Sequence, residues 1–172
     1  MYRTVNELNN FQFEEAYIDD MSFSGGCFTA QLENVKILPE NSCNRDIRVM
    51  RTNDLKFTIK SAELTEIIIE GYKRFDADGK LIENVDDENV DLEKNPGLLS
   101  ELSGATIYSI EKNDDNYVIC VETEEQIFDI KIKGEGFKAF VTTRYEDSAK
   151  GEGGADFIIW QQGANDYWAG QI

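Results

Sequence analysis

The chain has 172 residues, of which 41% are hydrophobic and 11% aromatic, and its 34 acidic residues outnumber its 17 basic ones to give a formal net charge of -17. This length and composition argue against an intrinsically disordered chain and predict one domain spanning residues 1–172. A surface this negative repels nucleic acid and anionic membranes, and the complete absence of histidine removes the commonest general base and metal ligand.

The dominant local signal is an alternation of apolar and polar residues, which is typical of half-buried strands. It runs through residues 28–32, slips by one position at Asn34, and continues at Val35 and Ile37. A slip of one residue predicts a β-bulge at Asn34. Similar alternation predicts further strands at residues 55–60, 128–133 and 137–143.

Short turns join the predicted strands, which indicates antiparallel neighbours because a parallel return needs a longer crossover. Asp76–Gly79 contains the Asp-Gly pair typical of hairpins, and it joins predicted strands at Ile67–Phe75 and Lys80–Val85. Further turns are predicted at residues 113–116, 122–125 and 134–136, between strands at residues 106–110, 117–121, 127–132 and 137–143.

One short helix is predicted at Gly97–Leu102, with Asn95 as its cap, Pro96 at its first position and Gly104 just after its end. A weaker pattern suggests a second helix within Asn6–Glu15.

The glycine-rich residues 148–155 predict a flexible loop before a C-terminal strand near residues 157–160. The predicted fold class is therefore α+β: a mostly antiparallel β-sheet, sandwich-like or half-barrel-like, with one or two short helices.

Catalytic and cofactor-binding signatures are absent from the sequence. Cys27, Cys43 and Cys120 are far apart and lack metal-ligand spacing, so we expect free thiols, no metal and no cofactor. The chain contains no nucleophile motif, no phosphate-binding loop and no histidine for a triad, so we expect no enzyme. Without a signal-peptide pattern or a long apolar span, cytoplasmic residence is the expectation.

The sharpest charge feature is the segment Asp76–Glu93, which contains eight acidic residues and a single basic one, Lys80. Its local net charge is about -7 with all side chains ionised. This segment is either a docking surface for a basic partner or a solvated loop that aids solubility. Its acidic residues are Asp76, Asp78, Glu83, Asp86, Asp87, Glu88, Asp91 and Glu93. Other acidic residues cluster at positions 14–20 and 114–125.

Calcium is an alternative ligand for this segment, because carboxylate oxygens suit it. Asp76 and Asp78 have the first spacing of an EF-hand loop, but Gly79 follows too early and no glutamate occupies the twelfth position. The segment is therefore not an EF-hand, and an irregular calcium site is the remaining calcium-binding interpretation.

Two other groups of residues have competing interpretations. The aromatic residues Trp160, Tyr167 and Trp168 lie near amide side chains, an arrangement that either stacks on sugars or holds a terminal strand to the core. A basic island could bind phosphate, or it could pair with acidic residues on neighbouring strands. The basic island comprises Arg45, Arg48, Arg51, Lys56 and Lys60.

The opening Phe11–Glu15, the alternating strand at Phe28–Ile37, the acidic segment and the lack of histidine together resemble bacterial immunity proteins. Those proteins neutralise the toxin domains of contact-dependent inhibition and other polymorphic toxin systems. The resemblance lies in the general character of the whole chain rather than in a motif, so it transfers no family residue to a position here.

This resemblance implies a cytoplasmic protein that binds a basic, nuclease-type toxin domain and occludes its surface. Under this hypothesis the acidic segment supplies hydrogen-bond acceptors, and exposed Tyr72 and Tyr108 supply anchors. The alternative is a β-rich module that recognises a glycan or calcium. An unpaired edge strand could also support a homodimer.

Overall fold

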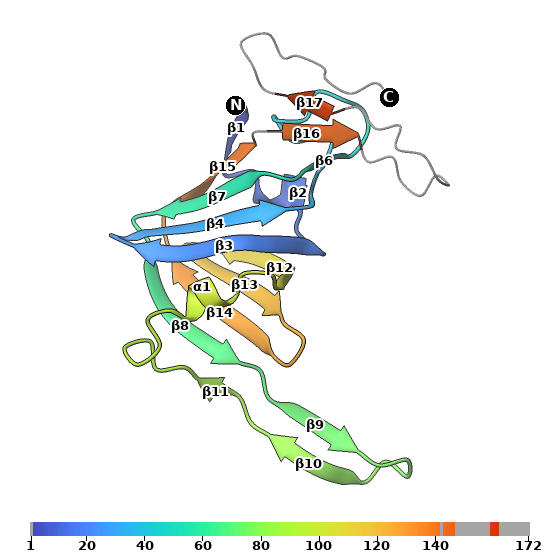
Figure 1. Cartoon of the computed structure of the whole chain (residues 1–172), viewed down its shortest axis with the longest axis vertical. Coiled ribbons are helices and arrows are strands. Elements are labelled where there is room, and N and C mark those ends of the chain that lie inside the picture. Colours follow the sequence, from blue (N-terminus) through green and yellow to red (C-terminus); the bar gives the residue numbers. More distant parts are fainter. Residues whose placement is uncertain (1, 142, 147–158, 162–172) are drawn as a thin grey trace.

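The computed structural model describes residues 2–141, 143–146 and 159–161, which form a large sheet, a smaller sheet and a projecting hairpin (Figure 1). The fold is mostly antiparallel β-sheet with one short α-helix, as the sequence predicted. No helix in these ranges has both the length and the apolar character required to cross a membrane.

The large sheet contains ten strands and is open, with β1 and β11 as its edges. One half consists of β1 (Tyr2–Val5), β15 (Gly136–Val141), β7 (Leu55–Lys60), β4 (Cys27–Glu33) and β3 (Ala16–Ser24). The other half consists of β12 (Thr106–Asn113), β13 (Asn116–Glu122), β14 (Ile127–Lys133), β8 (Glu63–Ile69) and β11 (Glu88–Asn89). The halves meet where β3 pairs with β12, in a contact of only two residue pairs.

The smaller sheet lies at the end of the molecule opposite the projecting hairpin (Figure 1). Its strand order is β17 (Ile159–Gln161), β16 (Thr143–Glu146), β6 (Met50–Thr52), β5 (Val35–Ile37) and β2 (Phe11–Gln12). Val35, Ile37 and Met50 are buried and belong to the same core as the large sheet.

The alternation seen in the sequence corresponds to the buried and solvent-facing sides of these strands. Every apolar member of the alternating sets is buried, because one face of each strand packs on the core. These residues are Phe28, Ala30 and Leu32 in β4, Leu55, Phe57 and Ile59 in β7, Phe128, Ile130 and Ile132 in β14, and Phe137, Ala139 and Val141 in β15.

The phase slip at Asn34 is a change of sheet rather than the predicted bulge. Asn34 adopts a left-handed φ of 61°, which turns the chain out of β4 and into β5. β4 pairs with β3 and β7 in the large sheet, whereas β5 pairs with β2 and β6 in the smaller one. The Asn34 side chain donates to the Glu15 carbonyl oxygen at 3.1 Å, which stabilises this switch point.

The centre of the core is a cluster of aromatic rings around Phe57. Its ring stacks on Phe137 with centroids 5.2 Å apart, and the rings of Phe13 and Phe28 meet it edge-on at 6.0 and 6.4 Å. These rings come from strands β4, β7 and β15 and from the segment after β2, so one side chain holds distant parts of the chain together.

The helix is shorter than predicted. α1 spans Leu98–Glu101, and Leu99 and the following Leu102 are buried. Asn95 is not its cap: Gly97 occupies that position, and the Asn95 side chain donates instead to the Asp91 carbonyl oxygen at 2.9 Å. The second predicted helix is a single 3-10 turn at residues 8–10 followed by β2.

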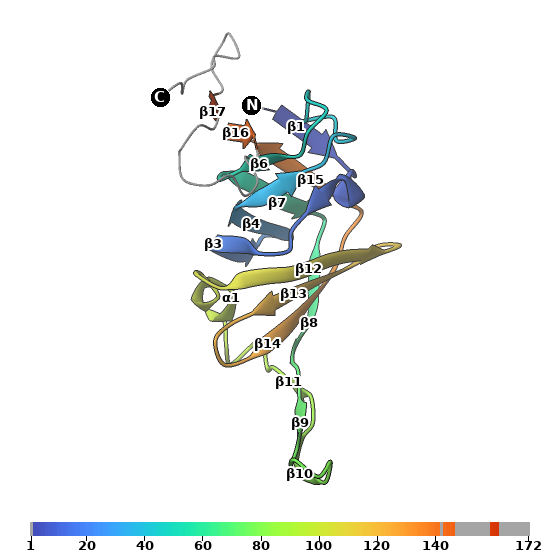
Figure 2. The same ribbon diagram turned by 90° about the vertical axis from the view of Figure 1, so that its right-hand side faces the viewer.

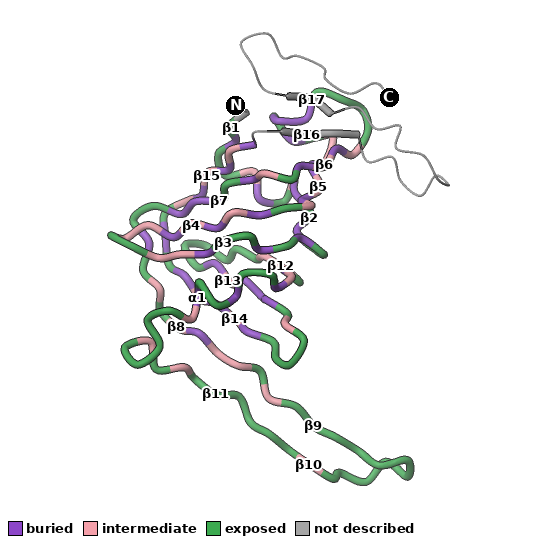
Figure 3. Tube along the Cα trace, viewed as in Figure 1, coloured by how far each residue is buried: buried purple, intermediate pink, exposed green. Residues whose placement is uncertain are grey.

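The predicted strand at Ile67–Phe75 is two strands, because pairing stops at Glu70 and Gly71. β8 ends at Ile69, and β9 (Tyr72–Phe75) begins a two-stranded hairpin with β10 (Leu81–Val85). The Asp76–Gly79 turn joins them as predicted. This β9–β10 arm, residues 72–85, extends away from the body of the molecule (Figures 1 and 2) and is exposed along almost its whole length (Figure 3).

The C-terminal predictions are described only in part. β17 at Ile159–Gln161 overlaps the strand predicted near residues 157–160. The predicted loop at residues 148–155 lies outside the described residues.

We predict that Phe57→Ala destabilises the fold by about 3–5 kcal/mol, because it empties the centre of the aromatic cluster. Chemical denaturation with urea measures this loss. Phe75→Ala is the matched control: the Phe75 side chain is 55% exposed in the arm, and its removal should change the free energy of unfolding by less than about 1 kcal/mol. Equal losses from the two substitutions would contradict the position assigned to Phe57.

Candidate functional site

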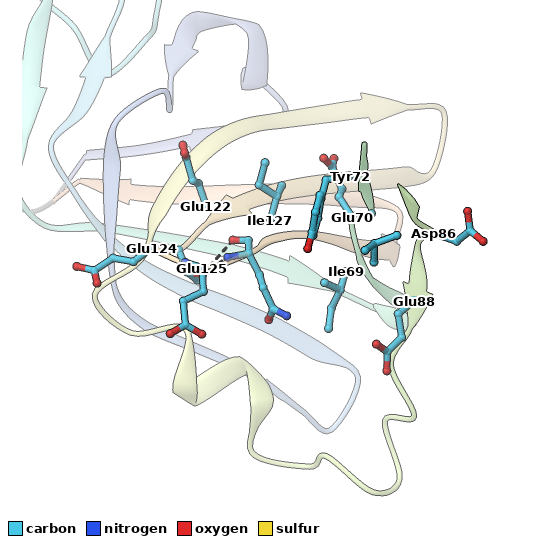
Figure 4. Close-up of a pocket in the computed structure, with 13 residues that line it drawn as sticks. Ile69, Glu70, Tyr72, Asp86, Glu88, Glu122, Glu124, Glu125 and Ile127 are labelled. Atoms are coloured by element: carbon cyan, nitrogen blue, oxygen red, sulfur yellow. Dashed lines mark hydrogen bonds between the residues drawn. The ribbon is translucent and has the colours of Figure 1, made fainter. Parts of the chain in front are cut away.

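A groove of about 530 Å³ lies at the base of the β9–β10 arm. One wall comes from the end of β8 and the start of the arm, and the other from the turn between β13 and β14 (Figure 4). We call it the acidic groove. It is lined by Ile69, Glu70, Gly71, Tyr72, Val85, Asp86, Glu88, Glu122, Thr123, Glu124, Glu125, Gln126 and Ile127.

The lining contains six carboxylates and no lysine or arginine. Glu122, Glu124 and Glu125 come from the β13–β14 turn, whereas Asp86 and Glu88 lie across from them near the arm (Figure 4). Desolvation raises the pKa of Glu70, and the nearby carboxylates of Asp129 and Asp87 raise it further. The groove is therefore a region in which acidic groups repel one another and a cation would be attracted.

Apolar side chains lie among these carboxylates. Tyr72 is 54% exposed, and Val85 and Ile127 are exposed to 41% and 36%. Tyr72 and Val85 are directly opposite each other in the hairpin, so they share one face of the arm at its base. Exposed apolar groups ringed by charge are typical of surfaces that bind another protein.

The arm is fixed to the body by a close backbone approach at Gly71. A Cβ atom at this position would lie 2.1 Å from the Val85 carbonyl oxygen and 2.6 Å from the Asp86 carbonyl carbon, so only glycine fits. The Gly71 N–H also donates to Asp87 Oδ1 at 2.8 Å. Together these contacts set the position of the arm beside the groove.

The opposite wall is held by Thr123. Its hydroxyl donates to the Gln126 carbonyl oxygen at 2.9 Å and accepts from the Gln126 N–H at 3.0 Å. The Thr123 N–H also donates to the Gln126 carbonyl oxygen at 2.9 Å. The turn leaves the side chains of Glu124 and Glu125 exposed at the groove.

The structure places the predicted acidic residues in several different settings. Asp86 and Glu88 line the acidic groove. Asp87 accepts the Gly71 N–H just described and therefore has a structural role. Glu83 pairs with Arg74 at 3.5 Å across the arm, where both side chains are exposed.

At the tip of the arm, the Asp76 side chain holds the hairpin turn that contains Asp78. Asp76 Oδ1 accepts the backbone N–H groups of Asp78 at 3.0 Å and Lys80 at 2.8 Å. The Asp76 carboxylate therefore has a structural role in the turn, and the irregular calcium site stays a prediction.

Asp91 and Glu93 lie beyond β11 in a second turn. Asp91 accepts from Lys94 Nζ at 2.8 Å and from the Glu93 N–H at 3.1 Å, and the bond to Lys94 lowers the pKa of the Asp91 carboxyl. Neither residue lines the acidic groove.

The two predicted aromatic anchors are separated. Tyr72 lines the acidic groove, whereas Tyr108 is on β12, which β13 and β14 separate from β8 in the sheet. Tyr108 is 61% exposed but does not line the groove. It therefore forms no single site with Tyr72.

The sequence-based site omitted Glu70 and the turn residues Glu122, Glu124 and Glu125. The signal for the turn was present as an acidic cluster, but a sequence cannot show that this cluster faces a hairpin much earlier in the chain. Glu70 had no signal, because its importance follows from the break between β8 and β9.

Glu70, which lines the groove, places a ligand-type atom within 4.8 Å of those of Cys120 and Asp129, the one such group in the part of the chain that is described. Burial raises the pKa of the Cys120 thiol to about 12, with Asp129 and Glu70 adding to the effect. The protonated thiol hydrogen-bonds to Asp129, and Cys120 is a buried packing residue. Cys27, Cys43 and Cys120 are all free thiols.

Three members of the basic island lie on strands, and none of them has an acidic residue directly opposite it. Arg51 lies opposite Lys36 and Tyr145, Lys56 opposite Gln31 and Phe140, and Lys60 opposite Cys27 and Gly136. The side chains of Trp160, Tyr167 and Trp168 lie outside the described residues, so the glycan interpretation stays a prediction.

Comparisons with known proteins give no relative. No protein-family model, no curated protein and no solved structure matches this chain.

We predict that Gly71→Ala lowers the free energy of unfolding by about 1–3 kcal/mol, because the new methyl group must displace the backbone at Val85 and Asp86. Thermal unfolding measures the loss. Gly97→Ala is the control, because the nearest atom to a Cβ there is the flexible Glu101 carboxylate at 3.8 Å. An unchanged melting temperature for Gly71→Ala would contradict the close approach.

We also predict that Glu70→Gln stabilises the protein at pH 7, by up to about 0.5 kcal/mol, because it removes one of several mutually repelling charges. A raised folded-state pKa means that Glu70 favours the folded state below its unfolded pKa and loses that contribution as pH rises through the folded pKa. Urea unfolding from pH 7 to pH 4 should therefore show the advantage of Gln shrinking as Glu70 becomes protonated. An advantage that grows on acidification would contradict this electrostatic account.

Proposed function

We propose that this protein is a cytoplasmic inhibitor of immunity-protein type, which neutralises a basic toxin domain of nuclease class by covering its surface. One observation carries the proposal: six carboxylates line a groove that contains no lysine or arginine and that exposes Tyr72, Val85 and Ile127. The protein acts by binding rather than by catalysis.

The charge of the groove matches what such a partner must present. A nuclease binds phosphates and so carries a positive surface, and carboxylates compete for the same groups. Long-range attraction between the net charge of -17 and this surface speeds association. The exposed apolar side chains of the groove then lose contact with water in the complex and slow dissociation.

Charge alone does not distinguish this site from the rest of an acidic protein. The distinguishing feature is the combination of unneutralised carboxylates with exposed apolar groups and a fixed, projecting arm. Elsewhere on the arm Glu83 is paired with Arg74, and Glu66 on β8 is paired with Lys131 at 2.9 Å.

The proposal predicts that a toxin gene lies immediately upstream of this gene, and co-expression with that toxin domain is the direct test. The protein should restore growth, and the purified pair should form a complex whose dissociation constant rises with salt concentration, because ions screen the attraction. No complex at low salt would refute the proposed function.

Neutralising the groove should weaken that complex at least about tenfold, mainly by slowing association. The variant combines Glu122→Gln, Glu124→Gln and Glu125→Gln. The matched control removes three charges elsewhere, with Asp19→Asn, Asp20→Asn and Asp114→Asn. Binding kinetics measured by surface plasmon resonance separate the two, and equal losses would show that net charge acts without a defined site.

A further inference from the structure

The β9–β10 arm leaves one strand edge open. β8 lies between β14 on one side and β11 on the other, whereas β9 pairs with β10 alone. β10 leads into β11, so both lie on the same side of the β8–β9 line. β9 therefore has one edge paired with β10 and one edge open. The open edge is on the same side as β14 is on β8, and within the described part of the chain no strand pairs with it.

The open edge begins where β14 ends. Ile69 lies opposite Phe128, and the Glu70 N–H donates to the Ile127 carbonyl oxygen at 2.9 Å. Before Ile127 the chain turns away towards β13, so nothing continues β14 alongside Tyr72–Phe75. The acidic groove occupies this corner, because Tyr72 and the Glu122–Ile127 turn both line it (Figure 4).

The arm also exposes an unusual share of apolar side chains. Ten large hydrophobic residues of the described chain are exposed, and five of them belong to the arm, namely Tyr72, Phe75, Leu81, Ile82 and Val85. A two-stranded hairpin with this much exposed apolar surface is marginal by itself, and a third strand is the usual means of stabilising it. An open edge provides the backbone hydrogen-bonding groups for such an addition.

We propose that β9 is a strand-addition site, which takes an extended segment of the basic partner running antiparallel to β9, with the basic C-terminal end of that segment in the acidic groove. This inference rests on the proposed function in one respect, that the segment belongs to the inhibited protein. Its direction follows from the sheet: an added strand collinear with β14 runs from the arm tip towards the groove.

The side chains of β9 define the chemistry of the segment. Tyr72 and Phe75 favour β-branched or aromatic residues opposite them. Lys73 and Arg74 disfavour positive charge opposite them, so the basic residues of the segment belong at its end, beside Glu70, Glu124 and Glu125. A second copy of this chain fits poorly, because symmetric pairing over Tyr72–Phe75 would put Lys73 opposite Arg74 of the other copy.

A synthetic peptide tests this without any natural partner. The probe is acetylated and amidated Val-Thr-Val-Thr-Lys-Lys-Lys, titrated into the isotope-labelled full chain and followed by NMR. Binding should shift the amide signals of residues 70–75 and 122–127, leave those of Tyr108 unchanged, and slow amide exchange within β9.

Two control peptides of equal charge isolate direction and backbone pairing. The reversed peptide, with its lysines first, puts positive charge against Lys73 and Arg74. A peptide with prolines replacing both threonines cannot form the strand ladder. Each should bind at least about tenfold more weakly than the probe, which corresponds to about 1.4 kcal/mol.

A pair of variants tests the role of the groove. Glu124→Gln with Glu125→Gln should weaken probe binding about five- to tenfold through loss of charge attraction. Asp114→Asn with Asp115→Asn removes equal charge from the turn at the other end of β13 and should change binding by less than about twofold. Asn also suits the left-handed φ of Asp114.

Equal binding of all three peptides would overturn strand addition, and so would amide-signal shifts spread over the whole acidic surface. Self-association of the free protein through β9 would overturn it as well. These results are separable from the proposed function. Toxin neutralisation without selective probe binding would support the proposed function and refute the strand-addition site. Selective probe binding without a toxin complex would support the strand-addition site and refute the proposed function.

Discussion

The close approach of the Val85–Asp87 backbone to Gly71 is the constraint on which the candidate site depends. It allows a strand that leaves the large sheet at Ile69 to continue as a separate hairpin with a defined direction. The Asp87 carboxylate fixes the same point by accepting the Gly71 N–H. The arm, the groove beneath it and the open edge of β9 all follow from this junction.

The groove gathers charge at some cost to the stability of the folded chain. The pKa of Glu70 is raised by desolvation and by Asp129 and Asp87, which means that the folded state holds this carboxylate in a position unfavourable for its ionised form. Functional surfaces commonly retain such unfavourable groups, because a partner of opposite charge relieves the repulsion on binding. The core around Phe57 lies in the other half of the sheet and stabilises the fold independently of this repulsion.

Much of the fold was predictable from sequence, because strand alternation and turn residues are local signals. The alternating sets at residues 28–32, 55–60 and 128–133 were all confirmed as half-buried strands, and the Asp76–Gly79 hairpin formed where Asp-Gly indicated it. The errors arose where the tertiary structure changes a strand's partners. Asn34 moves the chain between sheets, and Gly71 ends one strand and starts another, yet in sequence both resemble small irregularities in a continuous strand.

The candidate site was less predictable than the fold for the same reason. Acidic residues in one segment were visible, but several of them stabilise turns or pair locally, as Asp76, Asp91 and Glu83 do. The complementary wall comes from Glu122–Gln126, which only the pairing of β14 with β8 brings to the arm. Spatial adjacency of this kind depends on sheet order, which the sequence of one chain does not specify.

Carbodiimide cross-linking of the native complex, followed by mass spectrometry, tests the central claim most directly, because it joins carboxylates to lysines in contact without a spacer. The protein is captured with its partner from the host cell and cross-linked before digestion. Our account predicts links from Glu70, Asp86, Glu88 and the Glu122–Glu125 turn to lysines of one basic protein. Cross-links confined to Asp19, Asp20, Asp114 or Asp115, with none from the groove carboxylates to the partner, would contradict it.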